Sequence, residues 1–372
     1  MHMKIIDFDL DLPFFQQNRH LLRGMLRSLF ETGYPDMANQ QALLQESVFD
    51  EPLLYYHLLG SKAYYPIEQI TAGYKNVNTD AFESGQLPHA KDIHGRAYFP
   101  GIGYRDAAEN GFSDKNGGRE WLGGTGIELY KFIPNIILDH DPSVSYCPSS
   151  LIEDYRNALT QAIEKMRLIT PEFFELICAC TKNICLFRSD SLNSFAGITQ
   201  HGTCFINVVE TDSSEVFFID DLSHQCGHII FNILTAKTED FLNFDKDTYI
   251  RDLGGFDVDD RKIYSIFHGL FTYSCILGAL DAYLENTDAE EQSLLRLEAL
   301  VRLGFYITKM FVDLENLYGK NLFTPLGETY YAAFIKNYQR MYDKYHTVIK
   351  TFPYANQPYV FSFEQFLKDY AQ

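Results

Sequence analysis

Apolar residues recur at helical spacing through much of the chain, which indicates a mainly helical protein. In the first part of the sequence this periodicity covers Asn18 to Phe30 and Gln41 to Leu59. A second series begins near residue 152, where Ser150 is the expected helix cap and Thr170-Pro171 starts the next helix in cap-then-proline order. Further helices are predicted over 214–234, 261–284, 293–318 and 327–351.

Two short apolar runs interrupt the helical pattern in the middle of the chain. Asn183 to Phe187 and Thr203 to Val209 are rich in Ile, Val, Phe and Cys and are bordered by turn residues, so they predict strands. The sequence therefore predicts an α+β fold that is predominantly helical. A small β-sheet is expected to pack on the helix over 214–234 and on the C-terminal helices.

Turn-forming residues mark two breaks in the regular pattern. Residues 139–150, DHDPSVSYCPSS, contain two prolines and are expected to separate an N-terminal mixed helical and loop region, 1–145, from residues 146–372. Region 1–145 is the expected substrate-binding part. Residues 100–126 are dense in glycine and predict a loop, but they lack the Lys-Ser/Thr ending of a phosphate-binding loop.

Composition narrows the range of partners and compartments. The 372 residues have a formal net charge of -19, which repels nucleic acid and anionic membranes. No export signal and no stretch approaching the length of a bilayer span is recognisable, so a cytoplasmic protein is expected. The seven cysteines are then expected to be mostly buried free thiols, and Cys178-x-Cys180-x4-Cys185 lacks the second half of a zinc motif.

The segment SHQCGHIIFN carries the main candidate chemistry. His224 and His228 are four residues apart, so on a helix their rings lie one turn apart on the same face and can bind one metal ion. Zinc hydrolases place a glutamate directly after the first histidine to accept a proton from the metal-bound water. Here Gln225 stands at that position, and its amide cannot accept the proton. Metal binding is therefore predicted, but hydrolysis by the usual route is disfavoured.

A third ligand has to come from another part of the chain. His268 is the first candidate, because it lies in the next strongly apolar helix and precedes Gly269, which permits close helix approach. Asp221, one helical turn before His224, is a substitute carboxylate ligand, and His201 is a weaker substitute. Two histidines with a third ligand on one face and open positions opposite are typical of non-haem iron oxygenases.

Residues from Thr170 to Tyr283 resemble the HExxH-type 2-oxoglutarate-dependent peptide β-hydroxylases of modified-peptide biosynthesis, with Gln225 in place of the motif glutamate. The resemblance rests on the order strand, loop SFAGITQHGT, strand, metal helix, and then an arginine seven residues before His-Gly. It implies iron(II) held by His224, His228 and His268, with 2-oxoglutarate as cosubstrate and Arg261 paired to its far carboxylate. The implied substrate is a peptide, such as a ribosomal precursor peptide, hydroxylated at a side-chain β-carbon.

The sequence is also compatible with other functions. A zinc metallopeptidase-like protein would need Glu210, Glu215 or Asp221 to replace the missing base. A noncatalytic peptide-binding homologue would use an aromatic-rich, acidic surface to hold a basic peptide. Zinc is an alternative metal, because histidine binds both ions. Arg261 also follows Asp257, Asp259 and Asp260, so it could simply balance local acidic charge.

Overall fold

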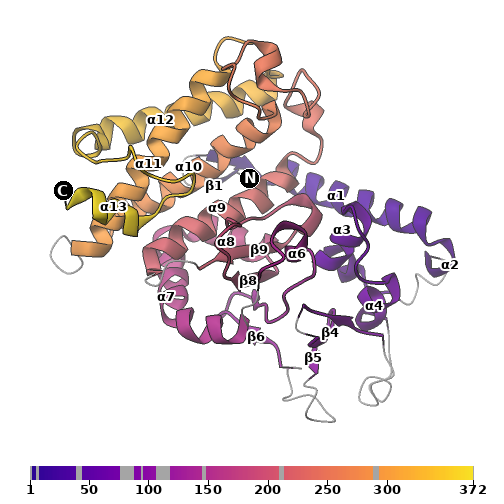
Figure 1. The fold of residues 1–372 in the computed structure, drawn as a ribbon. Helices are drawn as coiled ribbons and strands as arrows, with labels where there is room; N and C mark the ends of the chain where they lie inside the picture. Colours follow the sequence, from indigo (N-terminus) through magenta and orange to yellow (C-terminus); the bar gives the residue numbers. More distant parts are fainter. Residues whose placement is uncertain are drawn as a thin grey trace. The chain divides into compact units, whose positions relative to one another are not determined.

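The computed structural model describes residues 2–5, 8–38, 44–75, 88–93, 95–105, 118–144, 148–208, 213–287 and 293–371 (Figure 1). The chain forms two compact units, and each unit is assembled from separated segments. Unit 1 comprises Met1–Asn18, Asn157–Ile177 and Glu210–Gln372. Unit 2 comprises Arg19–Arg156 and Cys178–Val209. Both units thus draw on sequence from before and after residue 145.

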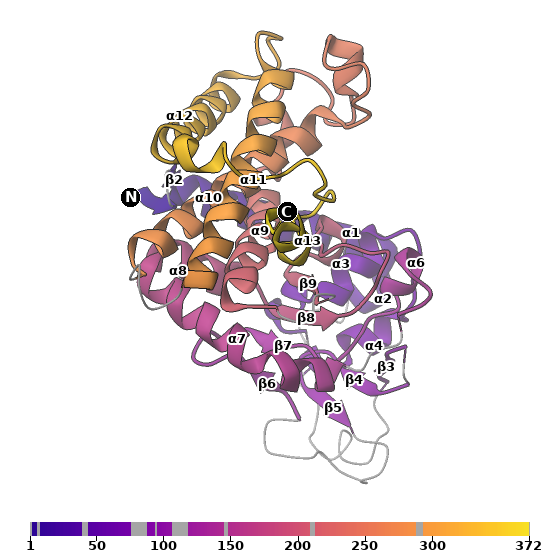
Figure 2. The same ribbon diagram turned by 60° about the vertical axis from the view of Figure 1, so that its left-hand side comes forward.

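Unit 1 is mainly helical. Its small antiparallel hairpin pairs β1 (His2–Ile5) with β2 (Phe8–Asp11). Its principal helices are α9 (Glu215–Leu234), α10 (Ile263–Glu285), α11 (Ser293–Leu317), α12 (Pro325–Ile349) and α13 (Phe363–Tyr370). The helices α7 (Pro148–Ile169) and α8 (Pro171–Cys180) each contribute to both units. Figures 1 and 2 both show α9, α10 and α11 side by side, and α10 packs against the other two.

Local chemistry explains where these helices begin. Ser214 caps α9, because its hydroxyl accepts a hydrogen bond from the Phe217 amide at 3.1 Å. Thr324 caps α12 in the same way, with Pro325 at the first helical position. The expected start of α8 at Pro171 is confirmed. The expected cap at Ser150 is wrong, because α7 already begins at Pro148, whose fixed φ favours a helix start.

Helix α10 is both long and strongly apolar, and its burial explains its composition. Its 23 residues are long and apolar enough to cross a membrane, which corrects the expectation that no stretch approaches that length. In the structure 83% of the apolar window is buried inside the protein. That burial is typical of the core helix of a water-soluble protein, which is hydrophobic all round because other elements surround it.

The described residues of unit 2 form two small sheets. In the antiparallel sheet β4 (Ala97–Phe99) lies between β3 (Ala90–Lys91) and β5 (Gly103–Arg105). The mixed sheet has the order β6 (Glu120–Trp121), β7 (Glu128–Leu129), β8 (Asn183–Phe187), β9 (Thr203–Asn207). Within it β7, β8 and β9 are parallel and β6 is antiparallel to β7. The predicted α+β, predominantly helical fold is confirmed, and so is the strand predicted over 183–187. The strand predicted over 203–209 is present but ends at Asn207, and residue 209 lies outside the described residues.

Short helices complete unit 2 beside α1 (Leu12–Gly33), which begins in unit 1. They are α2 (Pro35–Ala38), α3 (Pro52–Leu59), α4 (Ile67–Thr71) and α6 (Ile137–His140), with 3-10 turns η2 (Glu46–Asp50), η3 (Ala72–Tyr74) and η4 (Ile198–Gln200). The helix expected over 41–59 is only partly present, because Pro52 starts a new helix after η2; residues 41–43 lie outside the described residues.

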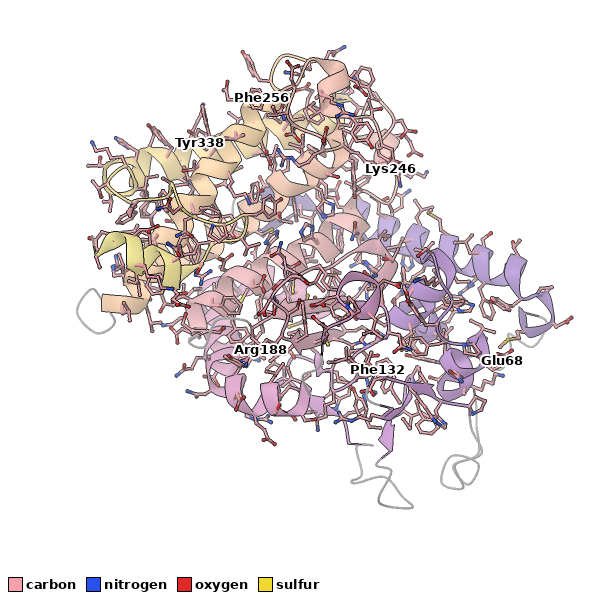
Figure 3. The ribbon with its side chains drawn as sticks, viewed as in Figure 1. Glu68, Phe132, Arg188, Lys246, Phe256 and Tyr338 are labelled. Carbon is pink, nitrogen blue, oxygen red and sulfur yellow. The ribbon has the colours of Figure 1, made fainter. Side chains whose placement is uncertain are left out.

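The core of unit 2 is rich in aromatic side chains. Tyr98 and Phe132 have ring centroids 4.9 Å apart, and Tyr130 packs against both. Figure 3 labels Phe132 within this unit, where it is fully buried. The fully buried Glu128 accepts hydrogen bonds from Tyr104 and Arg119. In the segment expected to be a loop, 100–126, β5 and β6 are short strands, and residues 106–117 lie outside the described part.

Candidate functional site

The helix α9 places His224 and His228 one turn apart on one face. Their ring centroids are 4.9 Å apart and both side chains are partly buried. The spacing of four residues therefore has the consequence predicted for a helix.

Close packing of α9 against α10 brings a third histidine to this pair. A Cβ atom on Gly227 would lie 3.3 Å from Cγ2 of Thr272 and 3.5 Å from Sγ of Cys275. Glycine thus permits the two helices to approach beside His228. His268 on α10 lies there, with Nε2 3.0 Å from Nδ1 of His228 and ring centroids 4.6 Å apart.

The surroundings keep the three imidazoles neutral. Burial lowers the pKa of His228 to about 4. Burial also lowers the pKa of His224 and of His268 well below the ordinary value, and the positive charges of neighbouring groups, including Lys309 near His224, lower it further. A neutral imidazole has a free lone pair, which is the form that binds a metal ion.

The donor set fits a divalent transition metal, but the cluster is not already arranged around one. Among the residues that the structure describes, no group of three or more His, Cys, Asp or Glu side chains is arranged to hold an ion. The contact of 3.0 Å between His228 and His268 is compatible with a hydrogen bond between neutral rings.

Gln225 is buried beside the histidines, at 1% exposure. Its Nε2 donates a hydrogen bond to Oδ1 of Asp221 at 3.0 Å, while its Oε1 has no hydrogen-bond partner within the described residues. Asp221, the substitute ligand, is thus engaged by the amide that replaces the hydrolase glutamate. Of the other two acids considered as a base, Glu215 accepts a bond from the Tyr283 hydroxyl at 2.7 Å, and Glu210 lies outside the described part.

Arg261 lies just before α10, and two carboxylates hold it. Its Nε and Nη2 donate to Asp259, and its Nη1 and Nη2 donate to Asp313 at 3.0 and 2.5 Å. The guanidinium therefore balances acidic charge. This is the second of the two roles considered for Arg261 from the sequence, the first being to bind the cosubstrate. Four of its five N–H groups already have an acceptor in these bonds, so little of its donor capacity remains for a cosubstrate.

The structure adds a buried ionic cluster that the sequence analysis did not identify. Asp220, one turn before His224, is 2% exposed, and its Oδ2 accepts from Nη1 of Arg302 at 3.0 Å. Arg302 also binds Glu298, which accepts a bond from the cap residue Ser214. Burial raises the pKa of Asp220 to about 7, against the opposing effect of Arg302. In the sequence, Asp220 could have been identified from its position four residues before His224, one helical turn away.

The weaker candidates from the sequence lie elsewhere. His201 belongs to unit 2, where it packs against Tyr55 with ring centroids 5.0 Å apart. Cys178 and Cys180 are on α8 and Cys185 is on β8. The six cysteines in the described part of the chain are free thiols, which confirms the expectation for those six.

A separate cavity of about 490 Å³ lies among α8, α10 and α12. Its polar lining includes Glu172, Asp281 and Arg340. Asp281 follows His268 by 13 residues on the same helix, a distance of roughly 20 Å along the axis. The cavity is therefore distinct from the histidine cluster.

No protein-family model matches the chain, and no curated protein matches it at a significant level.

Proposed function

We propose that this protein is an iron(II)- and 2-oxoglutarate-dependent oxygenase that hydroxylates a peptide side chain at its β-carbon, in the cytoplasm, during modified-peptide biosynthesis. The observation that carries the proposal is the meeting of His224, His228 and His268 in one cluster of neutral imidazoles. These three side chains would hold the metal. Iron(II) with 2-oxoglutarate and oxygen supplies the oxidising power needed to hydroxylate an unactivated carbon.

The residues around the cluster favour oxidation over hydrolysis. Gln225 has no proton-accepting group, and the neighbouring Asp221 is hydrogen-bonded to it. A zinc peptidase would need a base that can reach a metal-bound water, and Glu215 is bonded to Tyr283 instead. The net charge of -19 suits a basic peptide as substrate, because opposite charge accelerates encounter. A ribosomal precursor peptide with basic residues would meet this condition.

The test is spectroscopic and needs no peptide. Iron(II) and then 2-oxoglutarate are added to the metal-free, full-length protein without oxygen, and the visible absorption is recorded. The proposal predicts a charge-transfer band for the wild type and for His346→Ala, which changes a partly exposed histidine of α12 outside the cluster. It predicts no band for His224→Ala. A wild type without a band, or an unchanged band in His224→Ala, would contradict the proposal.

A noncatalytic peptide-binding role is the second candidate. It is favoured by the pairing of Arg261 with Asp259 and Asp313, which uses most of the donors expected to hold a cosubstrate. Titration calorimetry with a basic peptide in the presence of a chelator distinguishes this role. Binding that is equally tight with and without metal, together with no charge-transfer band, would favour the binding protein over the oxygenase.

A further inference from the structure

The cavity beside α10 lies within unit 1. Its volume of about 490 Å³ is in the range that is usual for small-molecule sites. Four helices contribute to its wall: the end of α7 at Ile169, the first turn of α8 over Pro171–Phe173, α10 from Gly278 to Glu285, and α12 at Arg340. Regular elements therefore hold this space open.

One part of the wall is apolar. Ile169, Pro171 and Phe173 contribute aliphatic and aromatic surface from the α7–α8 side, and Phe173 is anchored in the core at 1% exposure. On the α10 side, Ala282 has a short side chain and Gly278 has none. The space between these helices can thus accept an aliphatic chain.

The charged part of the wall is mainly acidic. Among the described residues that line the cavity, Glu172, Asp281 and Glu285 are acids and Arg340 is a base. Arg340 donates from Nη1 to Oδ2 of Asp281 at 2.7 Å, and Lys344 beside the cavity binds both Asp281 and Glu285. Three carboxylates and two cations leave one excess negative charge, which favours a cationic ligand.

The end of α10 adds to the negative potential. Glu285 is the last residue of this helix, and its side chain is 58% exposed. The carbonyl groups at the C-terminus of a helix carry partial negative charge and attract cations. Arg296 already binds there, because its Nη1 donates to the carbonyls of Leu284 and Thr287 at 2.6 and 2.9 Å. A cation in the cavity would experience the same field.

We propose that this cavity binds a primary alkylammonium group, as carried by the lysine side chain of a peptide or by a free aliphatic amine. The ammonium group would bind at the acidic rim, where Glu172 and Glu285 are exposed, and its chain would pack against Phe173 and Ala282. Its three N–H donors would form charge-assisted hydrogen bonds with carboxylate oxygens. Such binding requires neither a metal ion nor the histidine cluster.

The test uses two amines, each with a neutral control of similar shape. The amines are a capped tripeptide with lysine at its centre and n-pentylamine; the controls are the same tripeptide with norleucine and n-pentanol. Ligand-observed NMR gives the dissociation constants on the full-length protein without added metal. The wild type is expected to bind each amine about tenfold more tightly than its control, as one charge-assisted hydrogen bond would give. Tighter binding of the tripeptide than of pentylamine would identify a peptide as the source of the group, and the reverse order a free amine.

Variants of the wall locate the binding. The double variant Glu172→Gln, Glu285→Gln is expected to lose most of the preference for the amines. Glu175→Gln changes an exposed acid of α8 outside the cavity and should leave the preference unchanged. Ala282→Phe fills the cavity and should abolish binding of both amines. Circular dichroism checks that each variant folds.

Arg340→Gln tests the sign of the ligand charge. Asp281 keeps Lys344 and Tyr345 as partners in this variant, and the loss of a positive charge should tighten binding of the amines. A site for an anion would behave in the opposite way: pentanoate would bind the wild type more tightly than pentylamine and would be lost in Arg340→Gln. That result would overturn the proposal. So would equal affinity of the wild type for amines and controls, no binding of either amine, or a full preference in the double variant.

Discussion

Nδ1 of His228 and Nε2 of His268 lie 3.0 Å apart, although 40 residues separate them in the chain. The contact depends on the close approach of α9 and α10 at Gly227, where Thr272 and Cys275 occupy the space that a side chain would need. The position of a histidine pair is thus tied to one glycine.

Gly227→Ala is expected to destabilise the protein and to separate the histidines. The new Cβ atom would lie 3.3 Å from Cγ2 of Thr272, which is tighter than an ordinary contact, so the neighbouring side chain must move by a few tenths of an ångström, at an expected cost of about 1 kcal/mol. Gly269→Ala is the matched control, because its nearest neighbour would be Oδ2 of Asp313 at 3.6 Å, an ordinary contact. Urea denaturation gives both free energies of unfolding. Equal stability of the two variants would show that Gly227 does not limit the approach.

Arg302→Met is expected to cost about 3–5 kcal/mol, because it leaves the buried Asp220 and Glu298 without their cation. Arg251→Met removes an ion pair with Asp260 whose side chains are 43% and 76% exposed, and its expected cost is below about 1 kcal/mol. Thermal denaturation compares the loss of stability in the two variants, and the melting temperature of Arg302→Met is expected to be the lower one. Similar melting temperatures would mean that the buried cluster contributes no more than a surface pair.

Acid is expected to destabilise unit 2 through His201. Burial lowers its pKa to about 4 in the folded protein, whereas the unfolded value is 6.5. The unfolded chain therefore binds the proton more readily between these values, and stability is lost as the pH falls from 6.5 toward 4. Between pH 7.5 and pH 5 this histidine should account for about 2 kcal/mol of the loss.

His201→Phe keeps a ring beside Tyr55 and removes the titration. Urea denaturation at the two pH values should show a smaller difference for this variant than for the wild type. His224, His228 and His268, whose pKa values are also lowered by burial, contribute to the remaining difference. A variant with the full wild-type pH dependence would exclude His201 as a contributor.

Local patterns in the sequence predict the elements well and long-range pairs poorly. Helix α9 and strand β8 follow directly from periodicity, turn residues and the Ser214 cap. The contact of Arg261 with Asp313 spans 52 residues, and that of Arg302 with Asp220 spans 82. Such pairs depend on how helices pack, which single-sequence periodicity does not encode.

The same distinction applies to the candidate site. The spacing of His224 and His228 on one helix predicts their proximity, whereas the place of His268 beside them depends on packing at Gly227. The division into 1–145 and 146–372 stays a prediction, and both compact units draw on sequence from each side of that boundary.

The most direct test of the metal site is the iron content of the protein after anaerobic equilibrium dialysis against iron(II). One iron per chain is expected in the wild type, in His201→Ala and in His346→Ala, whereas His224→Ala, His228→Ala and His268→Ala are expected to lose that iron. A wild type that retains no iron, or cluster variants that retain it fully, would contradict the claim that these three histidines form a metal site.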